Sequence, residues 1–331
     1  MAPVSVIIAM CTFGTFLFVP IAVRCVQKGV SQTYHLLIHS LEAHMNKKIK
    51  GSFMLLITAI VWGFAFTAQS VGLDSVGSFT FNSIRYFIGG LVLLPVIFIM
   101  GKIQGRKEST FNKQALKGGI CCGICLFVAS SFQQYSLNYT TVGHCSFITA
   151  MYVIFVPVVE TIMGRKNDKK IWVCVFLALI GMYLLTMTGE NFTLSKGDLL
   201  VLIGSLCFTA HIMIIDKFSP TADGVTISCI QFFTASILSV PVMLFAEAPQ
   251  AGAIVSAWLP ILYAGVMSCG VAYTLQVVYQ KDVPPTPASI ILCLESVFGV
   301  IGGWLLLGQN LSIREIVGCV LMFIAIVLAQ I

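Results

Sequence analysis

The chain has 331 residues, of which 58% are hydrophobic and 10% are charged, and its formal net charge is +6. Charged residues make up about a quarter of a soluble globular protein, and the mean hydropathy here is +0.96. These values exclude an ordinary soluble domain. They indicate a polytopic helical membrane protein, because the apolar runs have helical length and lack the roughly 10-residue alternation of a β-barrel.

The first 44 residues differ from the rest of the chain. They hold one apolar run, Val4 to Val26, and then a polar stretch in which His35 and His39 share a helical face. One interpretation is an extra N-terminal helix or an uncleaved signal-like segment. We favour the other, a misplaced start, because Met45 opens a short basic head of the kind that precedes a first span. Two histidines without a third ligand predict no metal site.

From Phe53 onward, apolar segments of about 17 to 25 residues recur, which is the length that crosses a bilayer. Turn and charge signals separate them. They predict ten membrane-spanning helices in an all-α protein. The expected limits are 53–72, 79–100, 115–137, 143–163, 171–187, 198–216, 224–246, 255–279, 285–307 and 312–331.

Basic residues are distributed unevenly between the two sets of loops. Lys and Arg gather in one set of alternate loops, whereas the opposite loops carry only Lys196 and Arg314. Cytoplasmic loops carry the excess of positive charge in membrane proteins. We therefore expect a multi-pass protein of the cytoplasmic membrane, with both ends of the ten-helix unit in the cytoplasm. The same distribution explains the net charge without a nucleic-acid partner, and membrane lipids are the expected surroundings.

An internal repeat appears when the spans are aligned. Gly51 recurs as Gly197 and Pro95 as Pro241, at the same spacing along the chain. Five helices per copy is an odd number, so the second copy is expected to be inverted relative to the first. Many secondary transporters have this architecture, with a site between the repeats. The predicted domains are an N-terminal extension over 1–44, a first five-helix repeat over 45–189 and a second over 190–331.

Three ionisable residues, Arg85, His211 and Glu295, lie away from the ends of their predicted spans, where charge is costly and usually functional. Arg85 keeps its charge, so it is a docking point for a carboxylate or phosphate, or else part of a structural ion pair. Glu295 is either a proton-coupling group or a structural acceptor, and an Arg85–Glu295 pair would make both structural. His211 is a proton relay or a hydrogen-bonded packing residue.

Neutral polar and aromatic residues in the spans are candidates for orienting a small ligand, and the alternative for each is a bond between helices. We predict ring contacts from Trp62 and Tyr273, and hydrogen bonds from three glutamines. The wider inventory is Trp62, Gln69, Gln133, Gln134, Tyr135, Tyr273 and Gln276, from which Gln69, Gln134 and Gln276 are the chosen glutamines.

No enzyme motif stands out in the chain. The patterns HExxH, GxSxG, GxxxxGK[ST] and GxGxxG are all absent, so no catalytic residue, cofactor or metal is predicted. A lone Cys122-x-x-Cys125 lacks the second ligand pair of a zinc site. The missing phosphate loop also argues against an ATP-driven pump.

Segments of three predicted spans carry a family resemblance. They are WGFAF at 62–66, FTFNSIRYFIGGLVLLP at 79–95 and PASIILCLESVFGVIGGWLLLGQ at 287–309. Over Met45 to Ile331 the chain resembles the EamA-type members of the drug/metabolite transporter superfamily. The resemblance implies two inverted five-helix repeats, a central cavity and transport of small metabolites, often export of amino acids. Ser296 departs from the proline that the family often has after the acid of the ninth helix.

The resulting hypothesis is a secondary transporter that exports a small metabolite, such as an amino acid or a related compound, by alternating access with possible proton coupling. The alternative is a non-transporting membrane receptor or scaffold. A receptor or scaffold is expected to have a closed, fully packed centre with no solvent path from either side, whereas a transporter is expected to have a pocket that reaches one face. The sequence gives no expectation of oligomeric state.

Overall fold

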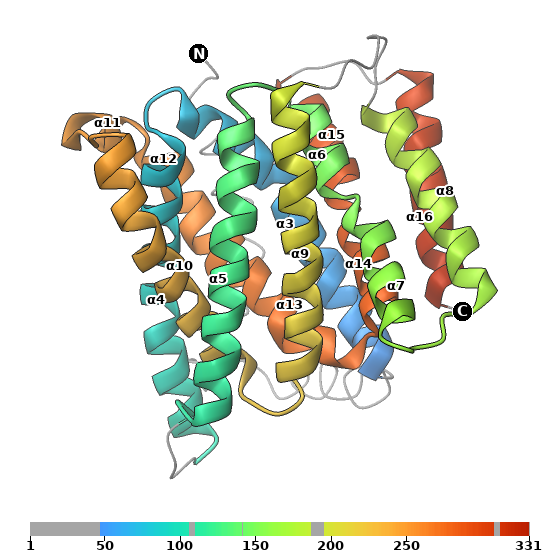
Figure 1. Cartoon of the computed structure of the whole chain (residues 1–331), viewed down its shortest axis with the longest axis horizontal. Coiled ribbons are helices and arrows are strands. Elements are labelled where there is room, and N and C mark those ends of the chain that lie inside the picture. Colours follow the sequence, from blue (N-terminus) through green and yellow to red (C-terminus); the bar gives the residue numbers. More distant parts are fainter. Residues whose placement is uncertain (1–46, 106–109, 141, 187–194, 308–311, 331) are drawn as a thin grey trace, which may run out of the picture.

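A computed structural model describes residues 47–105, 110–140, 142–186, 195–307 and 312–330. All regular structure in these ranges is helical. The long helices run roughly along one direction and form a bundle (Figure 1). The predicted extension over 1–44, with its two histidines, lies outside the described residues.

The first half of the bundle contains three long helices, a broken helix and a fifth helix. Asn112 caps the third of these helices, because its side chain accepts a hydrogen bond from the Ala115 N–H at 2.9 Å. The elements are α3 (Lys47–Leu73), α4 (Ser78–Ile103), α5 (Lys113–Ser136), α6 (Val142–Thr149), α7 (Tyr152–Ile162) and α8 (Lys169–Thr186).

The second half is similar but more irregular. Ser195 and Asp198 form a capping box at the start of its first helix, which satisfies two N–H groups that have no partner inside the helix. The elements are α9 (Lys196–Phe218), α10 (Gly224–Ala246), α11 (Ala251–Ser256), α12 (Trp258–Tyr263), the π-helix η1 (Ala264–Tyr273), α13 (Thr274–Tyr279), the 3₁₀-helix η2 (Gln280–Asp282), α14 (Pro285–Leu292), α15 (Glu295–Leu307) and α16 (Ile313–Gln330).

The membrane class predicted from composition is confirmed, but the count of ten is not. In the part of the chain that the structure describes, eight helical segments are long and apolar enough to cross a membrane. The eight do not include α8 and α16, which cover the predicted spans 171–187 and 312–331. Ten spanning helices therefore stay a prediction.

Two of the predicted spans are interrupted. The span expected over 143–163 is α6 followed by α7, with Ala150 and Met151 between them. The span expected over 285–307 is α14 followed by α15, with Cys293 and Leu294 between them. Each break lies partway along its span and brings helix ends into the interior of the bundle.

Close helix contacts hold the broken helices in place. A Cβ atom on Gly63 of α3 would lie 2.7 Å from the Glu295 carbonyl oxygen and 2.6 Å from Phe298 Cβ. On the other side of the bundle, a Cβ on Gly318 of α16 would lie 2.6 Å from the Gly181 carbonyl oxygen of α8. These glycines permit backbone contact of the kind common between membrane helices.

Candidate functional site

A narrow cavity lies where the two broken helices are interrupted. Its volume is about 40 Å³, which holds a few water molecules. Apart from the half-buried Trp62, the side chains around it are buried. The lining residues are Trp62, Ala65, Phe66, Gln69, Arg85, Gln133, Thr149, Tyr152, Phe208, His211, Ile212, Ser268, Tyr273, Gln276, Leu292 and Glu295.

Helix α4 supplies the positive charge of the cavity, Arg85, which is 2% exposed. Its Nη1 donates to Gln69 Oε1 at 3.1 Å, and its Nη2 donates to the Tyr86 hydroxyl at 2.9 Å. The guanidinium carbon also lies 4.7 Å from the Tyr86 ring centroid and 5.7 Å from that of Phe81. All of these partners are neutral, so the charge of Arg85 is solvated by dipoles and ring faces.

The break between α6 and α7 and the break between α14 and α15 lie next to each other at Glu295. Glu295 begins α15, and its Oε1 accepts a hydrogen bond at 3.2 Å from the hydroxyl of Tyr152, the first residue of α7. The last residues of the preceding helices, Thr149 and Leu292, also line the cavity. Helix ends from both breaks therefore surround the site, as in membrane proteins that bind ligands at discontinuous helices.

The mutual pair of Arg85 and Glu295, left open from the sequence, is not formed. No ion pair joins them among the described residues: the guanidinium binds Gln69 and Tyr86, and the carboxylate binds Tyr152. Each charge thus has neutral partners only. Both side chains lie on the same cavity, but they do not form a salt bridge with each other.

Aromatic rings form one wall of the cavity, as expected for Trp62 and Tyr273. The two ring centroids lie 4.5 Å apart. His211 packs edge-on against Tyr273 at 6.0 Å, and its Nε2 lies 3.0 Å from Gln231 Oε1. Both predicted ring residues line the cavity, as does His211, which has a hydrogen-bond partner.

The predicted glutamines are only partly at the cavity. Gln69 and Gln276 line it, but Gln134 lies outside it, with its Nε2 donating to the Gln69 carbonyl oxygen at 3.3 Å. The neighbouring Gln133 lines the cavity instead, and its Nε2 donates to Thr149 Oγ1 at 3.0 Å.

Three hydroxyl residues of the lining were missed from the sequence: Thr149, Tyr152 and Ser268. Hydroxyl side chains occur throughout the predicted spans, so residue type alone did not single them out. Two of the three flank the break between α6 and α7. That break has no proline or glycine to mark it, so the available signal was weak.

Three polar atoms at the cavity make no hydrogen bond with the protein: Trp62 Nε1, Arg85 Nε and Gln276 Oε1. Buried polar groups are nearly always paired. Two of these atoms are donors, one of them on a cation, and the third is an acceptor. Each of these atoms can still form a hydrogen bond with a molecule in the cavity.

Metal ligation has no support in the described residues, where no three His, Cys, Asp or Glu side chains gather closely enough. Cys122 and Cys125 are both free thiols. The chemistry of the site therefore rests on Arg85, Glu295 and the neutral polar groups.

A bundle of apolar helices around a buried polar cavity, with two helices broken at that cavity, defines a polytopic membrane protein with an internal site. The model of the EamA-like transporter family matches the chain twice, over residues 49–187 and 195–330. The chain belongs to this family. It is therefore a membrane transporter, and the resemblance noted from its sequence motifs is confirmed.

Individual relatives agree with this assignment. An uncharacterized transporter of Archaeoglobus fulgidus is 29% identical over 86% of this chain and 87% of its own length. The uncharacterized transporter YoaV of Bacillus subtilis is 22% identical over 82% of this chain and 94% of its own. A crystal structure of a protein only 14% identical superposes with a TM-score of 0.72 over 85% of this chain and 98% of its own, which shows a shared fold.

Proposed function

We propose that the chain is a secondary transporter that moves a small metabolite, such as an amino acid or a related compound, outward across the cytoplasmic membrane by alternating access. The observation that carries the proposal is Arg85, a buried cation without a carboxylate partner, on a cavity that also holds Glu295. A buried charge without a counter-ion is unfavourable, so a ligand that supplies the anion stabilises the site.

The proposed roles follow from the contacts. Arg85 binds the anionic group of the substrate, and Gln69 holds the guanidinium in place through its Oε1. Trp62 and Tyr273 contact an apolar part of the substrate, and Gln276 accepts a hydrogen bond from it. Glu295 exchanges a proton with the substrate or with solvent.

An inverted repeat of ten helices is supported by three observations. The family model matches the chain in two consecutive halves, and the fourth predicted span of each half is broken at a similar place. The first helices of the two halves also make matching contacts: a Cβ on Gly51 would lie 3.1 Å from the Tyr279 carbonyl oxygen, and one on Gly197 would lie 3.0 Å from that of Ser136. Such repeats permit two related conformations that open to opposite sides.

The proposed orientation places the ends of α7 and α9 and the start of α14 in the cytoplasm. These ends lie together, because Arg165 after α7 pairs with Asp216 on α9 and Glu160 on α7 binds Thr286 on α14. An impermeant thiol reagent applied to intact cells should label Lys196→Cys and leave Lys166→Cys unlabelled.

The small volume of the cavity bears on the alternative function. About 40 Å³ is too little for a metabolite, so this conformation is closed around the site. A transporter passes through such a state, whereas a receptor or scaffold without transport activity would keep it permanently. A measurement of substrate flux therefore distinguishes a transporter from a receptor or scaffold.

The test is a screen in proteoliposomes. Purified protein is reconstituted with a panel of labelled amino acids, nucleobases and sugar derivatives, and protein-free liposomes are the control. We expect saturable exchange of at least one compound. If protein that elutes as a single folded species moves none of them, the transport proposal is contradicted and the scaffold alternative is favoured.

A further inference from the structure

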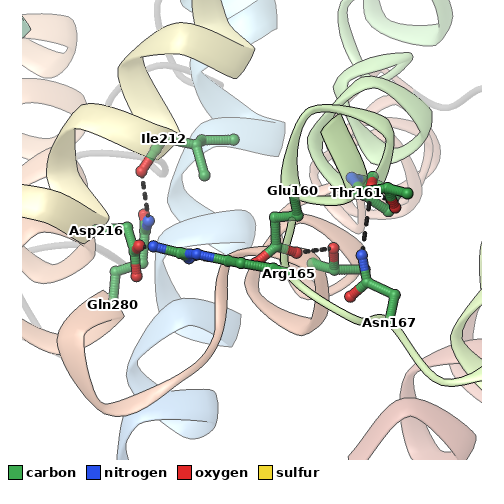
Figure 2. A network of polar contacts seen from close by, with 9 residues as sticks. Glu160, Thr161, Arg165, Asn167, Ile212, Asp216 and Gln280 are labelled. Carbon is green, nitrogen blue, oxygen red and sulfur yellow. Dashed lines mark hydrogen bonds and ion pairs between the residues drawn. The ribbon is translucent and has the colours of Figure 1, made fainter. Parts of the chain in front are cut away.

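Apart from the cavity, a polar cluster joins three helices at the end of the bundle where α7 and α9 end. Glu160 is 4% exposed, and its two oxygens accept hydrogen bonds from Arg165 Nη1 at 3.3 Å and from the Thr286 hydroxyl. Arg165 Nη1 also pairs with Asp216 Oδ2 at 2.8 Å. Figure 2 shows the Arg165 side chain extending between Glu160 and Asp216.

Local sequence dictates the position of this arginine. Gly164 follows α7 with a φ of 81°, a conformation that favours glycine. The Gly164 N–H donates to the Thr161 carbonyl at 3.0 Å, and the Arg165 N–H donates to the Glu160 carbonyl at 2.9 Å. This is a Schellman motif, and it turns the chain so that the arginine side chain extends back past the helix end.

The cluster joins the two proposed repeats. Glu160 and Arg165 belong to the first, and Asp216 and Thr286 belong to the second. Any motion that separates α7 from α9 and α14 at this end must break these bonds. The Arg165 side chain is 44% exposed, so water replaces its ion pairs readily.

The same region connects to the cavity. Gln280 Nε2 donates to the Ile212 carbonyl at 2.8 Å, and Gln276 Nε2 donates to Gln280 Oε1 at 3.1 Å. Both Ile212 and Gln276 line the cavity. Asp216 lies one helical turn beyond Ile212 on α9, so the cluster is next to these two hydrogen bonds.

We propose that Glu160, Arg165, Asp216 and Thr286 form a latch that keeps this end of the cavity closed and opens when the two repeats separate. The hydrogen bond to Asp216 raises the pKa of Arg165 above its ordinary value, so the cation of the latch stays charged. The proposal rests on alternating access, but its test needs no substrate.

The test measures how fast a cavity residue reacts with a water-soluble maleimide. Ala65 lines the cavity, is 1% exposed and makes no side-chain polar contact, so Ala65→Cys is the reporter. Full-length protein in nanodiscs, where both faces are accessible, is labelled over time, and the modified peptide is followed by mass spectrometry.

In this background, Asp216→Asn and Arg165→Gln are each expected to raise the labelling rate about fivefold, the ratio for roughly 1 kcal/mol. Asp216→Glu keeps the charge and should label at the original rate. The matched control is Lys166→Gln, which removes the adjacent exposed cation outside the latch.

An unchanged rate in the folded Asp216→Asn protein contradicts the latch, and so does an equal increase in Lys166→Gln. Should Arg165→Gln fail to fold, Asp216→Asn and Asp216→Glu still decide. If labelling responds as expected but no compound is transported, the proposed function fails and the latch stands. If transport is found but labelling does not respond, only the latch fails.

Discussion

Arg85 and Glu295 are the cation and the acid on the cavity, and each hydrogen-bonds to neutral partners only. A buried charge without a counter-ion is unfavourable, and no described residue gives Arg85 a carboxylate partner. The arrangement is explained if a ligand supplies an anionic group to Arg85 and Glu295 binds and releases a proton.

At the residue scale, Glu295→Gln tests proton coupling. Gln has the same shape and still accepts a hydrogen bond from Tyr152, but it cannot bind and release a proton in the physiological range. We expect substrate exchange to persist while the dependence of net flux on a proton gradient is lost. The measurement compares flux into proteoliposomes with and without an imposed gradient.

The matched control is Tyr152→Phe, which removes the hydrogen bond to Glu295 and keeps the acid. It should retain the gradient dependence. If net flux through Glu295→Gln still depends on the proton gradient, Glu295 has no role in coupling. Its role is then that of a structural hydrogen-bond acceptor.

Residue type identified most of the polar residues that line the cavity, because polar and charged groups are rare in membrane spans. It did not distinguish Gln133 from Gln134. Adjacent residues point about 100° apart on a helix of 3.6 residues per turn, and the rotation of α5 depends on its packing against α9 and α10. That packing involves residues far away in the chain, so the choice could not be made locally.

At the scale of elements, the sequence predicted the apolar spans but not their interruptions. Ala150, Met151, Cys293 and Leu294 are ordinary residues in helices, so neither break carries the proline or glycine that usually marks one. The ten-residue π-helix η1 was also not predicted from the sequence. Short π-helical segments inside α-helices often occur at functional sites. Contacts between helices determine these features.

The contact of α3 with α15 gives a prediction at this scale. Gly63→Ala places a methyl group 2.6 Å from Phe298 Cβ and 2.7 Å from the Gly299 nitrogen. Backbone and a packed side chain must then move, at a cost of about 1 to 3 kcal/mol for overpacking. We expect a lower thermal unfolding temperature in detergent.

The control for this substitution is Gly252→Ala on α11, where an added Cβ meets nothing within 4 Å. Its unfolding temperature should stay the same or rise, because alanine favours helix more than glycine does. Equal unfolding temperatures for Gly63→Ala and the unsubstituted protein would show that α3 and α15 are less tightly packed than the structure indicates.

For the whole molecule, the chemistry of the two proposed repeats is unequal. At the spacing that relates Gly51 to Gly197, the predicted counterpart of Arg85 is Gln231, which is fully buried and bonds to His211. In the fourth span of each predicted repeat, where that spacing is two residues shorter, Met151 is the counterpart of Glu295. The cavity thus has its cation on the first predicted repeat and its acid on the second, and under the proposed alternating access we expect inward and outward openings to expose the two groups differently.

The basic loops predict the orientation and the internal repeat predicts the symmetry, and both stay predictions. The size of the cavity could not be predicted, because it depends on how sixteen lining residues pack in one conformation. Substrate identity depends on the open states and is a matter for the flux screen.

The central claim is that a transported anionic group binds Arg85. The most direct measurement is exchange of the compound found in the proteoliposome screen by Arg85→Gln and Arg85→Lys, with Lys102→Gln as a control at an exposed cation. Hydrogen bonds to charged groups contribute about 1.5 to 3 kcal/mol, so Arg85→Gln should lower exchange at limiting substrate about tenfold to a hundredfold. Lysine should not restore it, because it lacks the guanidinium fork. Exchange by folded Arg85→Gln at the rate of the unsubstituted protein would contradict the claim.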